Sequence, residues 1–246
     1  GGLRILDVST PSAPAQRSFW AADAPIIDVH VSGNYAYLAA SANGLVVLNI
    51  SNPAAPQKTG ELYTEGMWIS DVAVSGNTAC LTDSVQGQVL VVDVGAPAAP
   101  VLKGTLPFAN AMTVQSRPGF AFAAARNGGV RIIDTSNPEA PVQKSEFVSC
   151  GSAGCVAWCP SYATCGDGVY AAMGDTGLHS LSIQDPARPQ IMSRVDTPGS
   201  AKAAFLKDGL IHLADHNRGF RIVNWVSGQT VGALETGFSS ARHLIV

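Results

Sequence analysis

Residues 44–56 read GLVVLNISNPAAP, and residues 129–141 read GVRIIDTSNPEAP, so the chain writes nearly the same phrase twice. Aligning this phrase along the chain gives six copies, with spacings of 42, 44, 41, 48 and 42 residues between successive anchor positions. The six anchors are Leu3, Leu45, Val89, Val130, Leu178 and Phe220. A period of this length, built from short β-type runs without a helical apolar period, is typical of four-stranded propeller blades. The sequence therefore predicts an all-β fold, a six-bladed β-propeller of four-stranded antiparallel blades.

The copy between residues 26 and 62 shows the strands of one blade most clearly. We expect strands at 26–31, 35–40, 45–50 and 57–62, joined by the turns SGN, SANG and SNPAAP. Glycine and asparagine in the SGN turn tolerate positive φ, which suits a tight hairpin. The third strand, LVVLNI, is apolar on both faces, as expected for a strand in a sheet packed between two other sheets.

The proline-rich segment after each third strand has a structural interpretation. Proline cannot donate a hydrogen bond to a strand ladder, so these segments must lie between strands. The first prolines are Pro11, Pro53, Pro97, Pro138 and Pro186, each followed three residues later by another proline. Short polar residues precede them and can accept hydrogen bonds from backbone amides two residues further on; these are Asp7, Asn49, Asp93, Asp134 and, in the last copy, Asn224. Their recurrence favours a structural role over a catalytic one.

Four phrases carry a family resemblance: GLRILDVSTPSAP, GLVVLNISNPAAP, QVLVVDVGAPAAP and GVRIIDTSNPEAP. They resemble the LVIVD repeat of bacterial and archaeal proteins, which are mostly exported or cell-surface propellers of undefined activity. The resemblance is weaker in LHSLSIQDPARP at 178–189 and weakest in FRIVNWVSGQTV at 220–231, where the prolines are gone. It implies a propeller fold and export, and it brings no set of family catalytic residues.

Composition and charge limit the kinds of partner that we expect. The 246 residues are 46% hydrophobic and 13% charged, which is enough apolar material for a single continuous propeller domain over 1–246. The net charge is -3 and the basic residues are scattered, so we do not expect a nucleic acid partner. No stretch approaches the roughly 18 consecutive apolar residues of a membrane span. We therefore expect no membrane span in this region.

The two ends of the chain are expected to share the last blade. Residues 240–246, SARHLIV, read as a first strand, whereas residue 1 begins within a third strand, so the second strand of that blade is missing. A missing internal strand leaves unpaired backbone on both sides. We expect either that the 246 residues belong to a longer polypeptide or that a partner supplies the strand. The partner would thus be another protein or a neighbouring domain of the same polypeptide.

Four cysteines cluster in the one long repeat, at Cys150, Cys155, Cys159 and Cys165. Their spacing matches neither a zinc knuckle nor a haem attachment site, so disulfides are favoured over a metal site or free thiols. The first pairing considered is Cys150–Cys155 with Cys159–Cys165, and Cys155–Cys165 or Cys150–Cys165 are rivals. Disulfides indicate an extracellular, cell-surface or periplasmic location. Cys80 stands alone and is expected to be a buried, inert thiol.

The loops that enter the first strands and those between second and third strands form one face at the channel mouth, which is the default binding surface. Ten residues map to this face: Asp28, Trp68, Asp71, Asp83, Arg126, Asp175, Asp215, His216, Arg242 and His243. Oxygen and imidazole ligands could hold calcium or another divalent metal, although polar residues on exposed turns are ordinary and no cofactor is predicted. Trp68 is either an exposed aromatic anchor for a partner or an inter-blade packing residue.

Catalytic signatures such as G-x-S-x-G, H-E-x-x-H or a phosphate-binding glycine loop are not found. The favoured function is therefore a non-catalytic extracellular or cell-surface module for interaction or structure. One alternative is a metal-assisted hydrolase or oxidoreductase that uses the channel mouth, because fold does not fix function. A second alternative is a carbohydrate-binding propeller.

Overall fold

The computed structural model describes residues 1–10, 12–125, 129–147, 168–201, 203–207, 209–216, 218–224 and 227–234, and within these ranges it contains strands and turns without a helix. The strands form six antiparallel sheets. The first two sheets are β1 (Gly2–Asp7) with β2 (Ala15–Ala21), and β3 (Asp28–Ser32), β4 (Tyr35–Ala39), β5 (Leu45–Asn49) and β6 (Gln57–Leu62). The next two are β7 (Ile69–Ser75), β8 (Thr78–Asp83), β9 (Gln88–Asp93) and β10 (Val101–Pro107), and β11 (Ala111–Arg117), β12 (Phe120–Ala125), β13 (Gly129–Asp134) and β14 (Val142–Phe147). The last two are β15 (Gly168–Ala172), β16 (Leu178–Ser182) and β17 (Gln190–Val195), and β18 (Ala203–Lys207), β19 (Leu210–Ala214), β20 (Phe220–Asn224) and β21 (Thr230–Leu234).

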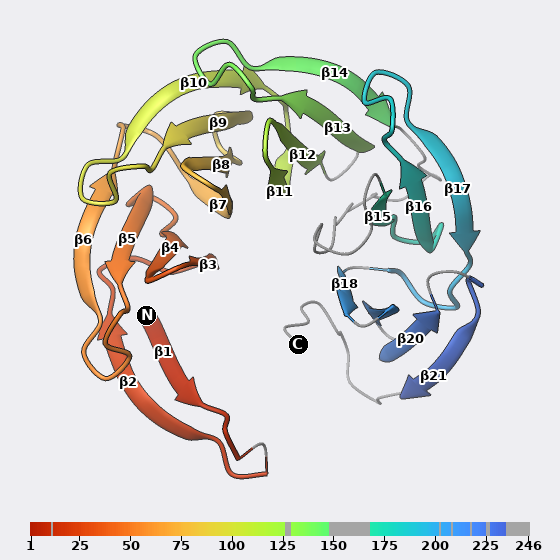
Figure 1. Cartoon of the computed structure of the whole chain (residues 1–246), viewed down its shortest axis with the longest axis horizontal. Helices are drawn as coiled ribbons and strands as arrows, with labels where there is room; N and C mark the ends of the chain where they lie inside the picture. Colours follow the sequence, from red (N-terminus) through yellow and green to blue (C-terminus); the bar gives the residue numbers. More distant parts are fainter. Residues whose placement is uncertain are drawn as a thin grey trace.

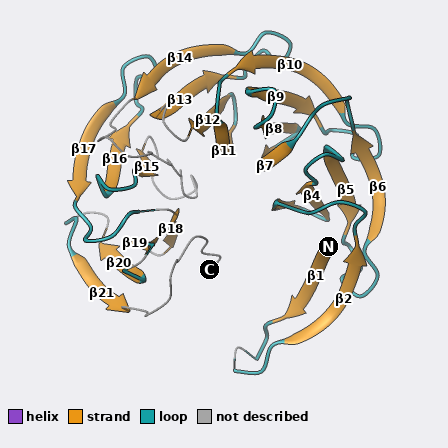
Figure 2. Ribbon diagram, turned by 180° about the vertical axis from the view of Figure 1, so that it is seen from behind, coloured by secondary structure: helices purple, strands orange, loops and turns teal. Residues whose placement is uncertain are grey.

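The sheets follow one another around an arc, and the chain runs from the centre outward within each complete sheet (Figure 1). The strands β3, β7, β11 and β18 lie nearest the centre, and the fourth strand of each repeat, such as β6 or β10, lies on the outside. The view from behind shows the same arrangement, with the β1–β2 sheet and β21 at the two ends of the arc (Figure 2). None of the described residues form a helix that is long and apolar enough to cross a membrane.

The strands expected from the repeat are confirmed. All six anchor positions fall on third strands, namely β1, β5, β9, β13, β16 and β20, and each of these pairs with a fourth strand. The third strand β5 is buried on both faces from Leu45 to Leu48. The SGN turns are two-residue hairpins in which Gly33 and Gly76 take positive φ angles of 57° and 59°. The expected first strand near residue 155 and the expected strand at 240–246 lie outside the described residues.

The polar residues that end the third strands make the predicted turn hydrogen bonds. Asp7 accepts the amide of Ser9 at 2.9 Å, and Asp134 accepts that of Ser136 at 2.9 Å. The side chains of Asn49 and Asp93 likewise accept a hydrogen bond from the backbone amide two residues later. Asn224 accepts one from the amide three residues later. The Ser9 amide lowers the pKa of Asp7 to about 2, and the Ser136 hydroxyl and amide lower that of Asp134 to about 2. Both groups are therefore structural carboxylates.

Every fourth strand carries a β-bulge at the same place, and a small residue follows each bulge. In the second sheet, for example, Leu48 pairs with Lys58 and Val47 pairs with Gly60, which leaves Thr59 as the extra residue. We call the residue after the bulge the seat residue; the six are Ser18, Gly60, Gly104, Ser145, Ser193 and Gly232. A bulge turns the strand locally and redirects its side chains.

The seat residue receives the proline loop of the next repeat. The Ser18 hydroxyl donates to the carbonyl oxygen of Pro53 at 2.7 Å, and the Ser145 hydroxyl donates to that of Pro186 at 2.6 Å. At Gly60 the loop comes closer still, because a Cβ atom there would lie 2.2 Å from the carbonyl oxygen of Pro97. The first prolines of four motifs, Pro53, Pro97, Pro138 and Pro186, thus dock on the preceding sheet.

Apolar side chains fill the space between adjacent sheets. Tyr37 and Val47 of the second sheet pack with Val72 and Val74 of the third, and all four are buried. The same type of packing joins the third sheet to the fourth and the fifth to the sixth. These seams form a core that is distributed around the arc, as expected when each sheet is covered by its neighbours.

Gly60→Ala tests the seat contact. The added Cβ would meet backbone atoms of Pro97 and Ala98 at 2.2 and 3.0 Å, so the loop must move away. We expect a loss of about 1–3 kcal/mol in the free energy of unfolding, the range of overpacking in a filled interior. Urea unfolding measures it, with the exposed Lys58→Ala on the same strand as the control, expected to change stability by less than about 0.5 kcal/mol. An alanine variant as stable as the wild type would contradict the contact.

Candidate functional site

The structure places the predicted channel-mouth residues in three separate groups. Asp28 and Asp71 lie on the inner strands β3 and β7, and Trp68 and Asp83 lie at the adjoining loops of the third sheet. Asp215 and His216 follow β19, while Asp175 is exposed in the turn between β15 and β16. Arg126, Arg242 and His243 lie outside the described residues, as do Cys150, Cys155, Cys159 and Cys165.

Asp28 and Asp71 connect three successive inner strands. Oδ2 of Asp71 accepts the amide of Val114 on β11 at 2.7 Å, and its Oδ1 accepts the amide of Val72 at 3.0 Å. Oδ2 of Asp28 accepts the same Val72 amide at 3.3 Å. Each acid thus reaches from its own sheet to the inner strand of the next sheet, and the two carboxyl groups meet at Val72.

Burial dominates the electrostatics of this pair. Asp71 is 5% exposed, and its burial raises its pKa well above the ordinary value. The charge of Asp28 and a hydrogen bond to it raise the pKa further, whereas the amides of Val114 and Val72 oppose the shift. A carboxylate that is desolvated next to another carboxylate holds its proton more tightly. Asp71 is therefore the member of the pair that is poised to hold a proton.

Trp68 and Asp83 form the second group. Oδ1 of Asp83 accepts three backbone amides, from Trp68 at 3.2 Å, Val85 at 3.1 Å and Gln86 at 3.0 Å. This fixes the loop that presents Trp68, which is 40% exposed. Oδ2 of Asp83 is buried and has no hydrogen-bond partner among the described residues. Of the two interpretations of Trp68, the structure favours a partly exposed aromatic held on a fixed loop.

Asp215 is held by a residue that the sequence analysis missed. Its Oδ2 accepts Nε of Arg221 at 2.9 Å and the amide of Gly199 at 3.1 Å, and its Oδ1 accepts the hydroxyl of Thr197 at 2.8 Å. Arg221 is 8% exposed, so this is a buried ion pair. The signal in the sequence was a charged residue inside a third strand, six residues after an aspartate. Asp215 is thus committed to folding contacts.

The remaining mouth residues do not join these groups into one site. His216 has a φ angle of 46°, and Ser41 at the same turn position of the second sheet also has 46°, so His216 occupies a recurring turn. Within the described ranges, no cluster of three or more His, Cys, Asp or Glu side chains could hold a metal ion. The arrangement offers a carboxyl pair, an exposed tryptophan and a buried ion pair.

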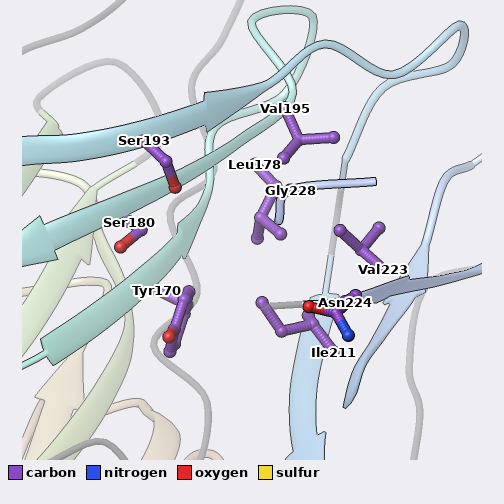
Figure 3. Close-up of a pocket in the computed structure, with 9 residues that line it drawn as sticks. All are labelled: Tyr170, Leu178, Ser180, Ser193, Val195, Ile211, Val223, Asn224 and Gly228. Atoms are coloured by element: carbon purple, nitrogen blue, oxygen red, sulfur yellow. The ribbon is translucent and has the colours of Figure 1, made fainter. Parts of the chain in front are cut away.

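A crevice lies between the fifth and sixth sheets (Figure 3). Tyr170 and Leu178 line one side, and Ile211 and Val223 line the other. The crevice leaves no room for a water molecule. The same four side chains pack against one another as part of the core between these sheets. The crevice is therefore a packing seam rather than a ligand site.

Cys80 is buried, as expected from the sequence. Cys80 is a free, fully buried thiol, and burial raises its pKa to about 12, which keeps it neutral and unreactive. His212 occupies the corresponding position of β19 and stacks against Phe220 with ring centroids 5.8 Å apart. Cys80 packs in the core between the third and fourth sheets.

Asp71→Asn tests the carboxyl pair. A folded-state pKa above the unfolded value gives stability that is fully present below the unfolded pKa and is lost as pH rises through the folded pKa. The stability of the asparagine variant relative to the wild type should therefore increase with pH from about pH 4 upward. Urea unfolding at several pH values measures this difference.

Two features make this comparison specific. The pKa values of His30 and His179 are lowered by burial, but both histidines titrate in wild type and variant alike and cancel in the difference. The exposed Asp175→Asn is the matched control, because it removes one carboxylate from an exposed turn. A pH-independent difference for Asp71→Asn would show that Asp71 is not the proton-holding group.

Solved structures with a similar fold cover nearly the whole chain. A protein from Lactobacillus plantarum superimposes with a TM-score of 0.79 at 14% identity, over 98% of this chain and 80% of its own. The computationally designed Ika8 protein gives 0.73 at 14% identity, over 100% of this chain and 72% of its own. Sqt1 of Saccharomyces cerevisiae gives 0.67 at 11% identity, over 85% and 62%. These matches identify the fold as that of β-propeller proteins.

Sequence comparison identifies the family. No curated protein matches the chain. The model of the LVIVD repeat matches residues 1–18, 26–64, 69–106 and 110–148, which is more than half of the chain. The matched segments coincide with the first four sheets. The chain therefore belongs to the LVIVD repeat family.

Proposed function

We propose that this chain is a non-catalytic module for interaction or structure that works outside the cytoplasm. It is a six-bladed ring whose last blade is shared between the two ends of the chain. A protein partner, or a neighbouring domain of the same polypeptide, attaches at the unfinished β1–β2 sheet. This proposal rests on the exposure of two apolar side chains. Leu6 lies on β1, and Val8 lies just after the end of β1.

The internal repeats show how unusual this exposure is. Leu6 is 51% exposed and Val8 is 63% exposed. The residues at the Leu6 position of the other five copies are at most 1% exposed: Leu48, Val92, Ile133, Leu181 and Val223. Among the described strands β1 pairs only with β2, whereas every other third strand has partners on both sides. An apolar strand with a free edge favours the addition of another strand.

The acids of the channel mouth support a non-catalytic role. Asp71 and Asp215 accept backbone amides of neighbouring segments, and Asp83 accepts two amides of the turn that follows it and the amide of Trp68 in the loop before β7. The competing enzyme class finds its best support in the free, buried Oδ2 of Asp83. A metal ion that stays bound in stoichiometric amount through dialysis and is lost in Asp83→Asn would favour that class. The second alternative, carbohydrate binding, finds its best support in the partly exposed side chain of Trp68.

The export proposal depends on the four clustered cysteines. Two disulfides among Cys150, Cys155, Cys159 and Cys165 fit an oxidising compartment and a repeat with an insertion. Each disulfide removes two hydrogen atoms, so the intact mass measured with and without reductant counts them. Equal masses in the secreted protein would oppose disulfides.

Gly232→Ala tests the closed ring. Gly232 is the seat residue of β21, and a Cβ there would meet no atom closer than 3.6 Å, from Ile222 of its own sheet. In a closed ring this seat would receive the proline loop of the first repeat, as Gly60 receives Pro97. We expect the alanine variant to lose about as much stability as Gly60→Ala, in the range of about 1–3 kcal/mol. A variant as stable as the wild type would mean that the arc stays open.

Hydrogen exchange tests attachment at β1. The amides of β1 that point away from β2 should exchange at least about tenfold more slowly in the protein purified undenatured from its source than in the isolated 246 residues. Outer strand β6 has one free edge in both samples and serves as the internal reference. Equally fast exchange of the β1 amides in both samples would oppose attachment there.

A further inference from the structure

The five other copies of the repeat indicate what kind of strand the β1 edge accepts. We infer that β1 binds an extended segment of a partner polypeptide, antiparallel to β1, with a small or branched aliphatic residue opposite Leu6 and an aromatic residue opposite Ile5. This inference rests on the proposed attachment at β1 and adds the chemistry of the segment. It follows from the residues that pair with the equivalents of Leu6 and Ile5 elsewhere in the chain.

The residues opposite the Ile5 position are mostly aromatic. They are Tyr37, Cys80, Phe122, Tyr170 and His212, which pair with Val47, Val91, Ile132, Ser180 and Ile222. Four of these five side chains carry a ring, and directly opposed residues share one face of a sheet. The strand that completes the β1 sheet should therefore present a ring beside Ile5.

The residues opposite the Leu6 position are small or branched aliphatic. They are Ala36, Ala79, Ala121, Val169 and Ile211, which pair with Leu48, Val92, Ile133, Leu181 and Val223. All five are at most 3% exposed. A larger residue at this place would overfill the space between two sheets. The only Lys, Arg, Asp or Glu in these five strands is Asp83 at the end of β8, so a segment with a charge in its middle does not fit the edge.

Val31 identifies the surface that receives the aromatic residue. On the third sheet the equivalent residue, Val74, is 7% exposed and packs in one cluster with Tyr37 and Tyr35 of the preceding sheet. Val31 occupies the same position on β3 but is 57% exposed, and among the described strands the preceding sheet has none that would carry such rings. An aromatic residue bound opposite Ile5 would cover Val31 as Tyr37 covers Val74.

Peptide binding to the chain tests this inference. The probe is a fluorescein-labelled peptide with the sequence of residues 34–41, NYAYLAAS, which contains β4. The control peptide carries Asp in place of the second tyrosine. Fluorescence anisotropy should show saturable binding of the first peptide and binding at least about tenfold weaker for the second, as expected for loss of a central aromatic contact.

Two protein variants locate the binding. Val31→Asp places a carboxylate where the ring would pack and should weaken binding at least about tenfold. Val142→Asp on the outer strand β14 is the matched control, since Val142 is 53% exposed, and it should bind like the wild type. Both substitutions affect exposed side chains, and thermal unfolding checks that both variants fold.

The outcomes separate this inference from the proposed function. Failure of the wild type to bind the tyrosine peptide, or equal binding by Val31→Asp, would overturn the inferred chemistry. If β1 amides are nevertheless protected in the native protein, the edge is occupied by a segment of another kind and the attachment itself stands. If the β1 amides exchange equally fast in the protein purified from its source and in the isolated 246 residues, the proposed function is overturned instead.

Discussion

The arrangement of the sheets depends on one recurring contact, in which a proline carbonyl rests on a small residue of the preceding sheet. The contact needs three features at once. A bulge turns the fourth strand, a glycine or serine after the bulge leaves room, and a loop outside any ladder brings its carbonyl oxygen to that place. The same loop is shaped by the hydrogen bond that ends the third strand. One motif therefore ends a strand and also docks its sheet on the sheet before it.

A second set of hydrogen bonds joins the sheets near the centre of the arc. There the acceptors are aspartate carboxylates, whereas at the outer strands the acceptors are proline carbonyl oxygens. Asp28 and Asp71 each accept an amide from the inner strand of the next sheet. Burying carboxyl groups in this way costs free energy unless they are hydrogen-bonded or protonated. The raised pKa of Asp71 is the result of this placement. Acidic residues around a channel mouth can thus serve assembly, and their presence alone is weak evidence for a binding site.

Local features were predictable from the sequence, and contacts between sheets mostly were not. Strand positions and turn hydrogen bonds follow from alternation and from short polar residues before prolines, which act within a few residues. The pairing of Asp215 with Arg221 depends on how a turn meets a strand in three dimensions. The seat contact is an instructive exception, because a small residue lies fifteen residues after the anchor in five copies: Ser18, Gly60, Gly104, Ser145 and Ser193. A conserved offset between a small residue and a repeat anchor is therefore a sign of inter-sheet docking.

The energetics of the β1 edge explain why the segment that completes it needs an aromatic residue. Covering the exposed parts of Leu6, Val8 and Val31 contributes on the order of 1 kcal/mol each, or about 3 kcal/mol in all. Ordering five residues of a partner as a strand costs on the order of 1 kcal/mol per residue. The surface of this chain alone therefore falls short by about 2 kcal/mol. Burying an aromatic ring of the partner contributes about 1.5–3 kcal/mol. The main-chain hydrogen bonds of the edge are open to any extended segment, so the side chains of the partner decide which segment binds.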